Sequence, residues 1–245
     1  MKRAPLAIAM LVLATAAVRP GARTDASGHR PVTRLVTESR GTVVASLLGD
    51  DEVRRSERER VRRALRENSS GTYMSEMLAS RDSALARWPD RRDDPIRVWI
   101  APASAIADWT PGLVEAVRSA FLAWDAVELP ARFTFVQDSA DAEVTVGWID
   151  RFTQSISGRT RWARDDRWWI TDASITLAVH HHQGETLAPD AMHAMALHEI
   201  GHMLGLDHTT DSGCVMAPRV RVRELSAADR ATVRLLYSLP PGEVR

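Results

Sequence analysis

The stretch from residue 198 to residue 208 constrains this chain more than any other. It reads His-Glu-Ile-Gly-His-Met-Leu-Gly-Leu-Asp-His. At about 100° per residue, His198 and His202 lie roughly 40° apart and one turn along a helix, so both imidazoles can point at one ion. Gly205 can leave the helix with a positive φ and return His208 as a third nitrogen ligand. The stretch therefore predicts a helix that ends in a turn around one metal ion.

The ligand set indicates which metal binds and what it does. Three neutral imidazoles suit Zn²⁺ and leave the fourth tetrahedral position for water, which is typical of a catalytic site. Glu199 follows the first ligand, so its carboxylate can reach that water without being a ligand itself. It would take a proton from the attacking water and return it to the leaving amine. Peptide-bond hydrolysis is the reaction that this arrangement serves best.

Composition excludes several other classes of protein. The 245 residues are 44% hydrophobic and carry 32 basic and 32 acidic side chains, which is typical of a globular protein and not of a disordered one. With no net charge there is no general attraction to nucleic acid or to anionic membrane. Cys214 is the single cysteine, which excludes an intramolecular disulfide and a multi-cysteine metal site.

The N-terminus resembles an export signal. Met1-Lys2-Arg3 precedes an apolar run from Ala4 to Val18, which is too short for a comfortable membrane-spanning helix. We expect residues 1–20 to be a signal peptide cleaved near Ala16, and the protein to be secreted or extracytoplasmic without stable membrane insertion. An uncleaved signal anchor is the alternative.

A charged segment follows at residues 21–85. Residues 51–68 predict a helix with a thin apolar stripe, and residues 74–85 predict a second one. So narrow a stripe cannot support a domain alone. The segment could be a pro-segment, a helical brace on the next domain, or a solvated spacer, and the sequence does not choose among them.

The folded domain is expected at residues 86–240, because all eight tryptophans lie between Trp88 and Trp169. Alternating or β-branched patterns predict strands and three- to four-residue spacing predicts helices. The predicted order is strand, helix, three strands and two helices, and it indicates an α+β fold. The predicted strands span residues 96–100, 133–136, 144–148 and 173–179, and the first predicted helix of the domain spans residues 111–127.

The motif His-Glu-x-x-His-x-x-Gly-x-x-His, followed by Cys214-Val215-Met216-Ala217-Pro218, resembles the metzincin zinc endopeptidases, with Met216 at the methionine of the turn beneath the metal. Residues 120–124, 140–146 and 225–237 resemble the matrixin branch, the matrix metalloproteinase family. The resemblance covers about residues 88–237. It implies a twisted, mixed five-stranded sheet with three helices, one of which carries the motif, and a substrate cleft across the zinc.

The same resemblance implies two substrate contacts. Ile175, Thr176 and Leu177 would be the edge strand that binds an extended peptide, since an unpaired edge can accept one more strand. Pro218 and Val220 would form a wall of the pocket for the side chain after the cleaved bond.

Two features depart from the matrixin pattern. Vertebrate matrixins are kept latent by a pro-segment cysteine, but no cysteine precedes Cys214. If residues 21–85 inhibit, they do so sterically or with another ligand, and a chain starting near Ala86 should then be more active than the full mature chain. The structural-zinc loop is not evident either, and we expect residues 180–182, three adjacent histidines, to be a solvated loop.

Three further features of the sequence bear on metal binding or reactivity. His193 lies around 140° from His198 on the helix and is not expected to be a ligand. Asp165 and Asp166 could contribute to a calcium site, but two adjacent oxygen donors are too few to define one. Cys214 is expected to be a small buried residue, not a reactive thiol.

Taken together, the residues favour a secreted zinc-dependent endopeptidase that acts as a monomer on an extended peptide or protein substrate. A non-catalytic zinc- or peptide-binding module on the same fold is an alternative, which Glu199 disfavours because metal binding alone needs no base. A maturation protease with one partner substrate is the other alternative.

Overall fold

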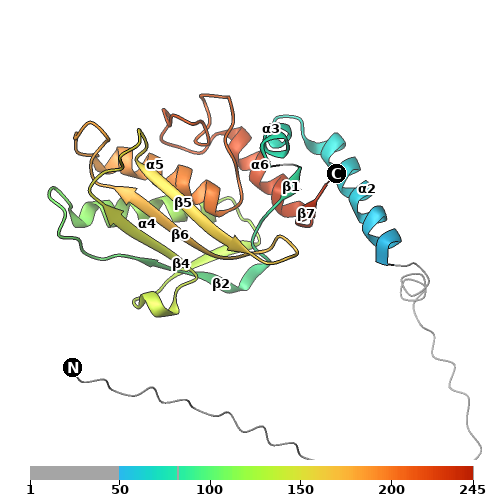
Figure 1. The fold of residues 1–245 in the computed structure, drawn as a ribbon, viewed down its shortest axis with the longest axis horizontal. Helices are drawn as coiled ribbons and strands as arrows, with labels where there is room; N and C mark the ends of the chain where they lie inside the picture. The colour runs from blue at the N-terminus through green and yellow to red at the C-terminus, as the bar shows by residue number, and fades with distance from the viewer. Residues whose placement is uncertain (1–49, 82, 245) are drawn as a thin grey trace, which may run out of the picture. The chain divides into compact units, whose positions relative to one another are not determined.

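The computed structural model describes residues 50–81 and 83–244, and the predicted signal peptide lies outside them. Within these ranges five α-helices and a mixed five-stranded sheet make an α+β fold, as the sequence predicts. Figure 1 shows the sheet with α4 and α5 on one face. None of the described helices is both long and apolar enough to span a membrane. The helices are α2 (Asp50–Asn68), α3 (Met74–Ser80), α4 (Pro111–Asp125), α5 (Pro189–Met203) and α6 (Ala227–Ser238), with a short 3₁₀ turn η1 (Ser139–Asp141).

The sheet runs in the order β3-β2-β4-β6-β5, and only β5 is antiparallel to its neighbour. Its strands are β2 (Arg91–Ile100), β3 (Ala131–Phe135), β4 (Val144–Ile149), β5 (Gly158–Arg164) and β6 (Ile170–Ala178), and a separate pair joins β1 (Ala84–Leu85) to β7 (Gly242–Glu243). Strand β5 has no counterpart among the strands predicted from residue patterns. It becomes one edge of the sheet.

Helix α4 forms where apolar residues recur at three- and four-residue intervals, and it begins with Pro111 in the first turn, where proline costs no hydrogen bond. Its buried stripe includes Val117, Phe121 and Trp124. The indole of Trp124 donates to the carbonyl of Leu197 in α5 at 3.0 Å. This bond joins the buried faces of the two helices and helps to hold α5, which carries the first two histidines of the motif, against α4.

The segment before the sheet packs on the domain. Helix α2 occupies the charged stretch in which the sequence predicts a helix, and Val61 and Leu65 of its thin stripe are buried. Helix α3 ends at Ser80, earlier than the pattern suggests, because the chain then turns through Ser83 at φ +65° and enters β1. Met74 and Met77 belong to the same buried apolar cluster as the helices of the domain.

Candidate metal centre and active site

Three histidines converge at the end of α5. His198 and His202 project from one face of the helix, and Gly205 at φ +99° turns the chain so that His208 returns to them. The Nε2 atoms lie 3.1, 3.2 and 3.3 Å apart. A tetrahedral Zn²⁺ with bonds of about 2.0–2.1 Å would hold its nitrogens roughly 3.3–3.4 Å apart. The donor set and spacing therefore fit a zinc ion.

Backbone carbonyls orient the first two rings. The Nδ1 of His198 lies 2.7 Å from the carbonyl oxygen of Val215, and the Nδ1 of His202 lies 3.0 Å from that of Leu206. A proton on each Nδ1 leaves the Nε2 lone pair free for a metal. Burial lowers the pKa of His198, and burial with the neighbouring His198 lowers the pKa of His202 to about 3. Both rings are thus held in the neutral form that binds metal.

A buried methionine lies directly against the helix. Met216 is fully buried, and a Cβ on Gly201 would collide with its sulfur, so any larger residue at this position of α5 would force the Met216 side chain to move. The carbonyl of Met216 accepts a hydrogen bond from the amide of Thr209 at 3.1 Å. The turn of Val215 and Met216 therefore contacts both the helix and the loop after His208.

The carboxylate of Glu199 is held in a nearly dry environment. The residue is 3% exposed, and the hydroxyl of Thr160 lies 2.6 Å from its Oε2. Burial raises the pKa of Glu199 to about 7, although the Thr160 hydrogen bond and the charge of Arg159 act in the opposite direction. A carboxyl group poised near neutral pH can accept a proton and give it back.

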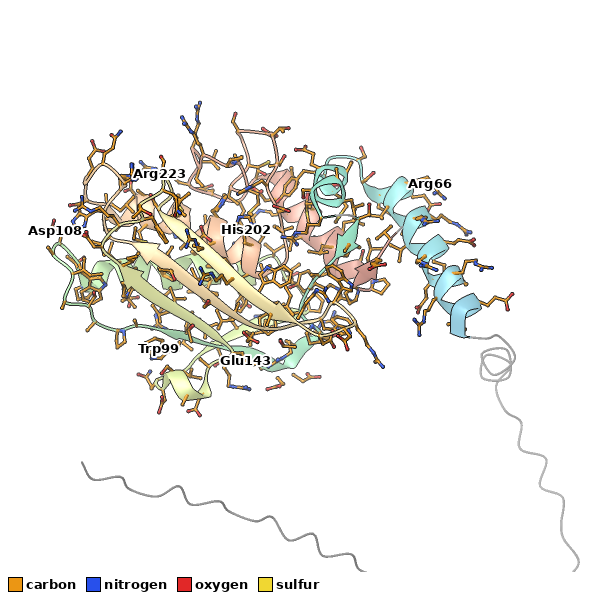
Figure 2. All side chains as sticks on the ribbon, viewed as in Figure 1. Arg66, Trp99, Asp108, Glu143, His202 and Arg223 are labelled. Carbon is orange, nitrogen blue, oxygen red and sulfur yellow. The ribbon has the colours of Figure 1, made fainter. Side chains whose placement is uncertain are left out.

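The histidines and the glutamate line one cleft of about 460 Å³. Figure 2 marks His202 in this region, on α5. The remaining lining residues come from four places in the chain. They are Ser155, Ile156, Ser157, Gly158, Arg159 and Thr160 before and within β5, His181 after β6, Met195 in α5, and the loop residues Pro218, Arg219 and Val220. The structure thus places Pro218 and Val220 in the cleft. Their role as the wall of a substrate pocket stays a prediction.

The prediction that residues 175–177 form an edge strand of the sheet is wrong. Ile175, Thr176 and Leu177 lie in β6, which pairs with β4 on one side and with β5 on the other. An internal strand has no unpaired backbone groups to offer a peptide. The edge beside the cleft is β5, whose polar, arginine-rich sequence gave no clear strand signal.

The three adjacent histidines differ from the solvated loop that the sequence predicts. His180 is buried, with its Nδ1 2.7 Å from Asp150 and its Nε2 3.1 Å from Asp108. His181 contacts Ser157 and lines the cleft. The three rings do not share one metal position, because the only three-residue metal-ligating group among the described residues is that of His198, His202 and His208.

His193 contacts α4, where the Ser119 hydroxyl lies 2.8 Å from its Nδ1. That His193 is not a metal ligand stays a prediction. The expectation that Cys214 is a buried residue is confirmed. Cys214 is 1% exposed, and burial raises the pKa of its thiol to about 11. A thiol with so high a pKa is protonated at neutral pH and is not a ready nucleophile.

Sequence reasoning missed Gly158 and Thr160, which hold the Glu199 side chain. Thr160 donates to the carboxylate, and a Cβ on Gly158 would collide with it. Their sequence signal is the alternation of small and large residues at 158–161, Gly-Arg-Thr-Arg. It is hard to recognise because both faces of the strand carry polar residues.

One family model and two known proteins match parts of this chain. Residues 150–238 match the family model described as matrixin. The chain is 30% identical over 80 residues to Metalloendoproteinase 1 of Glycine max, covering 31% of this chain and 24% of the relative. It is 26% identical over 164 residues to Neutrophil collagenase of Homo sapiens, covering 57% of this chain and 30% of the relative. The matches thus span less than a third of the length of either relative.

The α+β fold and the three-histidine group in a cleft define a metzincin-like domain. Within that class the matched part of the chain, residues 150–238, is matrixin-like, as its sequence resemblance predicts.

Proposed function

We propose that this protein is an exported zinc-dependent endopeptidase. His198, His202 and His208 would hold the metal, and Glu199 would act as the general base. The observation that carries the proposal is the convergence of three Nε2 atoms at 3.1–3.3 Å in a cleft that also contains the Glu199 carboxylate.

Each residue has a physical task in the proposed reaction. The three histidines would hold a zinc ion, which would supply a Lewis acid for activating water and polarising a peptide carbonyl. Glu199 takes the proton of the attacking water and passes it to the leaving amine, while Thr160 keeps the carboxylate oriented. Met216 supports the helix from beneath, because its sulfur packs directly against Gly201.

The substrate is a peptide in extended conformation. Strand β5 is the antiparallel edge of the sheet and supplies Gly158, Arg159 and Thr160 to the cleft lining. A substrate strand that pairs with this edge would pass across the histidines. Pro218 and Val220, on the facing loop, would contact the side chain that follows the cleaved bond.

The test is hydrolysis of a mixed peptide library by the zinc-loaded full chain. Glu199→Ala should lower the rate by at least about 100-fold without loss of the metal, because the base and not a ligand is removed. A chelator should abolish the activity, and added zinc should restore it.

Two results would contradict the proposal. Zinc binding without cleavage of any peptide or protein would favour the non-catalytic module. Cleavage that survives Glu199→Ala would remove the glutamate from the mechanism. Broad digestion of an unrelated protein would exclude the narrower maturation protease with a single substrate.

A further inference from the structure

The turn that carries the third histidine is held by an arginine from the N-terminal segment. Arg81 follows α3, and its guanidinium donates to the carbonyl of Gly205 at 2.8 Å, to the carbonyl of Leu206 at 2.9 Å and to the carboxylate of Asp207 at 3.1 Å. The Arg81 side chain is only 18% exposed. A fork of three donors thus binds three consecutive residues of the turn.

Two of those residues, Leu206 and Asp207, contact metal ligands directly. The carbonyl of Leu206 is the same oxygen that faces the Nδ1 of His202 at 3.0 Å. The carboxylate of Asp207 accepts a hydrogen bond from the backbone amide of His208 at 2.7 Å. Arg81 therefore binds the groups that set the direction of two of the three imidazoles.

His208 needs this support more than the other ligands do. It is the exposed member of the three, and its Nδ1 has no hydrogen-bond partner among the described residues, whereas the other two rings each have a backbone carbonyl. Metal-binding histidines ordinarily have such a partner, which fixes the ring. The position of His208 must therefore come from its backbone.

A residue within α3, Glu76, contacts the chain on the other side of His208. The Glu76 carboxylate accepts a hydrogen bond from the amide of Thr210 at 2.7 Å and lies 3.3 Å from the hydroxyl of Thr209. Ser80 donates to Asp207 at 2.7 Å. Contacts from one short helix and the residue after it thus fix the chain both before and after His208.

The same segment does not cover the cleft. Every residue that lines it lies at position 155 or later, and none comes from the described part of the segment before residue 86. The segment instead contacts the outside of the metal-binding turn through Arg81. In Figure 1, α3 lies beside α6, on the side of the domain away from the tips of β4 and β6.

We propose that residues 74–81, the α3 clasp, are a permanent part of the metal centre and that Arg81 is a positioning residue for His208. The inference rests on the proposed metal site but not on the proposed hydrolysis. It places any removable inhibitory pro-segment upstream of the clasp, so the catalytic unit would begin before residue 74 and not near residue 86.

The test is made on the full chain with Arg81→Gln and with Arg87→Gln as the matched control. Arg87 is also a largely buried arginine that donates to backbone carbonyls, those of Trp88 and Leu239, but it does not contact the metal-binding turn. The dissociation constant for Zn²⁺ is measured by competition with a chelator, and the Co²⁺-loaded proteins report ligand geometry by visible absorption.

Arg81→Gln should weaken zinc binding by roughly 10- to 100-fold, the usual effect of losing a group that orients a ligand. It should also change the Co²⁺ spectrum, whereas Arg87→Gln should change neither. Zinc affinity within twofold of wild type in Arg81→Gln, or an equal loss in both variants, would overturn the proposal. Thermal unfolding of the metal-free proteins separates this effect from a general loss of stability.

A second variant keeps the test decisive if Arg81→Gln does not fold. Arg81→Lys retains the charge but places all its donors on one nitrogen, so it cannot reproduce the planar fork that reaches three separate acceptors; it should fold and still weaken zinc binding. Folded Arg81→Lys with wild-type affinity would count against the proposal.

Peptide hydrolysis distinguishes the clasp from an inhibitory segment, because the two roles predict opposite signs. Loosening an inhibitor raises the rate, whereas loosening the clasp lowers it. A rise in Arg81→Gln would overturn the proposal. If no variant or wild-type chain cleaves any peptide, the proposed function fails, and the zinc measurements still decide the role of Arg81.

Discussion

At the scale of single residues, Gly158 sets the position of the proposed base. A Cβ there would collide with the Glu199 carboxylate, which must then move away from its hydrogen bond with Thr160. Gly158→Ala should lower kcat/KM by about 100-fold, because small misplacements of a catalytic group are costly. Zinc affinity should not change, because no ligand is touched.

The control for this prediction is Gly147→Ala, in strand β4. A Cβ on Gly147 would meet no atom within 4 Å, so this variant should keep wild-type activity. Equal rates for the two variants would show that the carboxylate tolerates displacement and that its present position is not needed.

His180 makes part of the stability depend on pH. Its ring is 7% exposed and lies between Asp108, which Figure 2 marks in the loop between β2 and α4, and Asp150, which also pairs with Arg151. The hydrogen bond with Asp108, followed by that with Asp150, raises the pKa of His180 although burial opposes the shift. The folded state therefore binds the proton more tightly than the unfolded state, in which the pKa is about 6.5.

The stabilisation from His180 should be complete below about pH 6.5 and should disappear as the pH rises through the higher pKa of the folded state. The free energy of unfolding lost in His180→Gln, measured with urea, should thus be larger near pH 6 than near pH 9. Salt should reduce it, because both aspartates are more than half exposed. A loss that grows with pH would show that the neutral ring is the stabilising form.

At the scale of elements, the sequence predicts those whose apolar residues follow one period. Helix α4 and strands β2, β3, β4 and β6 were recognisable because each has an apolar face that packs in the core. The motif also predicted the geometry of His198, His202 and His208, since helical spacing and one glycine determine it. The order of strands in the sheet was not predictable locally, and so β6 was mistaken for the edge.

Strand β5 was missed for a physical reason. An edge strand beside a cleft needs one face against the core and one in solvent, and charged side chains there also prevent pairing with other chains. Arg159, Arg161 and Arg164 supply that charge and hide the strand pattern. The Arg81 fork was equally invisible, because it joins residues more than 120 positions apart.

The positive charges that β5 and the loop after Met216 bring to the cleft predict a preference for acidic substrates. Arg159 and Arg219 line the cleft, and Glu199 is the only carboxylate of its lining. The hydrogen bond that Arg159 donates goes to the neutral side chain of Gln154 and not to a carboxylate. Peptides with Asp or Glu near the cleaved bond should be hydrolysed faster than neutral ones, because opposite charges attract and steer the substrate.

Arg219→Gln should lower kcat/KM for acidic peptides by roughly 3- to 10-fold and leave neutral peptides unchanged. The difference should shrink between ~0.05 M and ~0.5 M NaCl. Arg221→Gln is the matched control, because this exposed arginine lies on the same loop but does not line the cleft. A uniform loss for all peptides, or the same loss in the control, would contradict the predicted selectivity.

At the scale of the whole described molecule, the buried carboxylate of Asp229 joins three distant parts. It accepts hydrogen bonds from the hydroxyl of Tyr73 at 3.1 Å, from the amide of Val215 at 3.1 Å and from the amide of Ser226 at 2.8 Å. The segment before the sheet, the turn beneath the metal centre and the start of α6 therefore meet at one charged group. Such a shared acceptor predicts that these parts unfold together.

A double-mutant cycle tests this coupling. Tyr73→Phe removes one hydrogen bond to a buried charge and should cost about 1.5–3 kcal/mol of the free energy of unfolding. Asp229→Asn should cost more, roughly 3 kcal/mol or above, because it removes the negative charge that the donors of Tyr73, Val215 and Ser226 share. The double variant should be less destabilised than the sum by about 1 kcal/mol, since both changes weaken the same contact between Tyr73 and Asp229. The measurement is urea unfolding of the metal-free chain, followed by fluorescence and by circular dichroism, and both signals should show one coincident transition. Two outcomes would show that the N-terminal segment is an independent unit: strictly additive losses in the double variant, or a separate early transition in either signal.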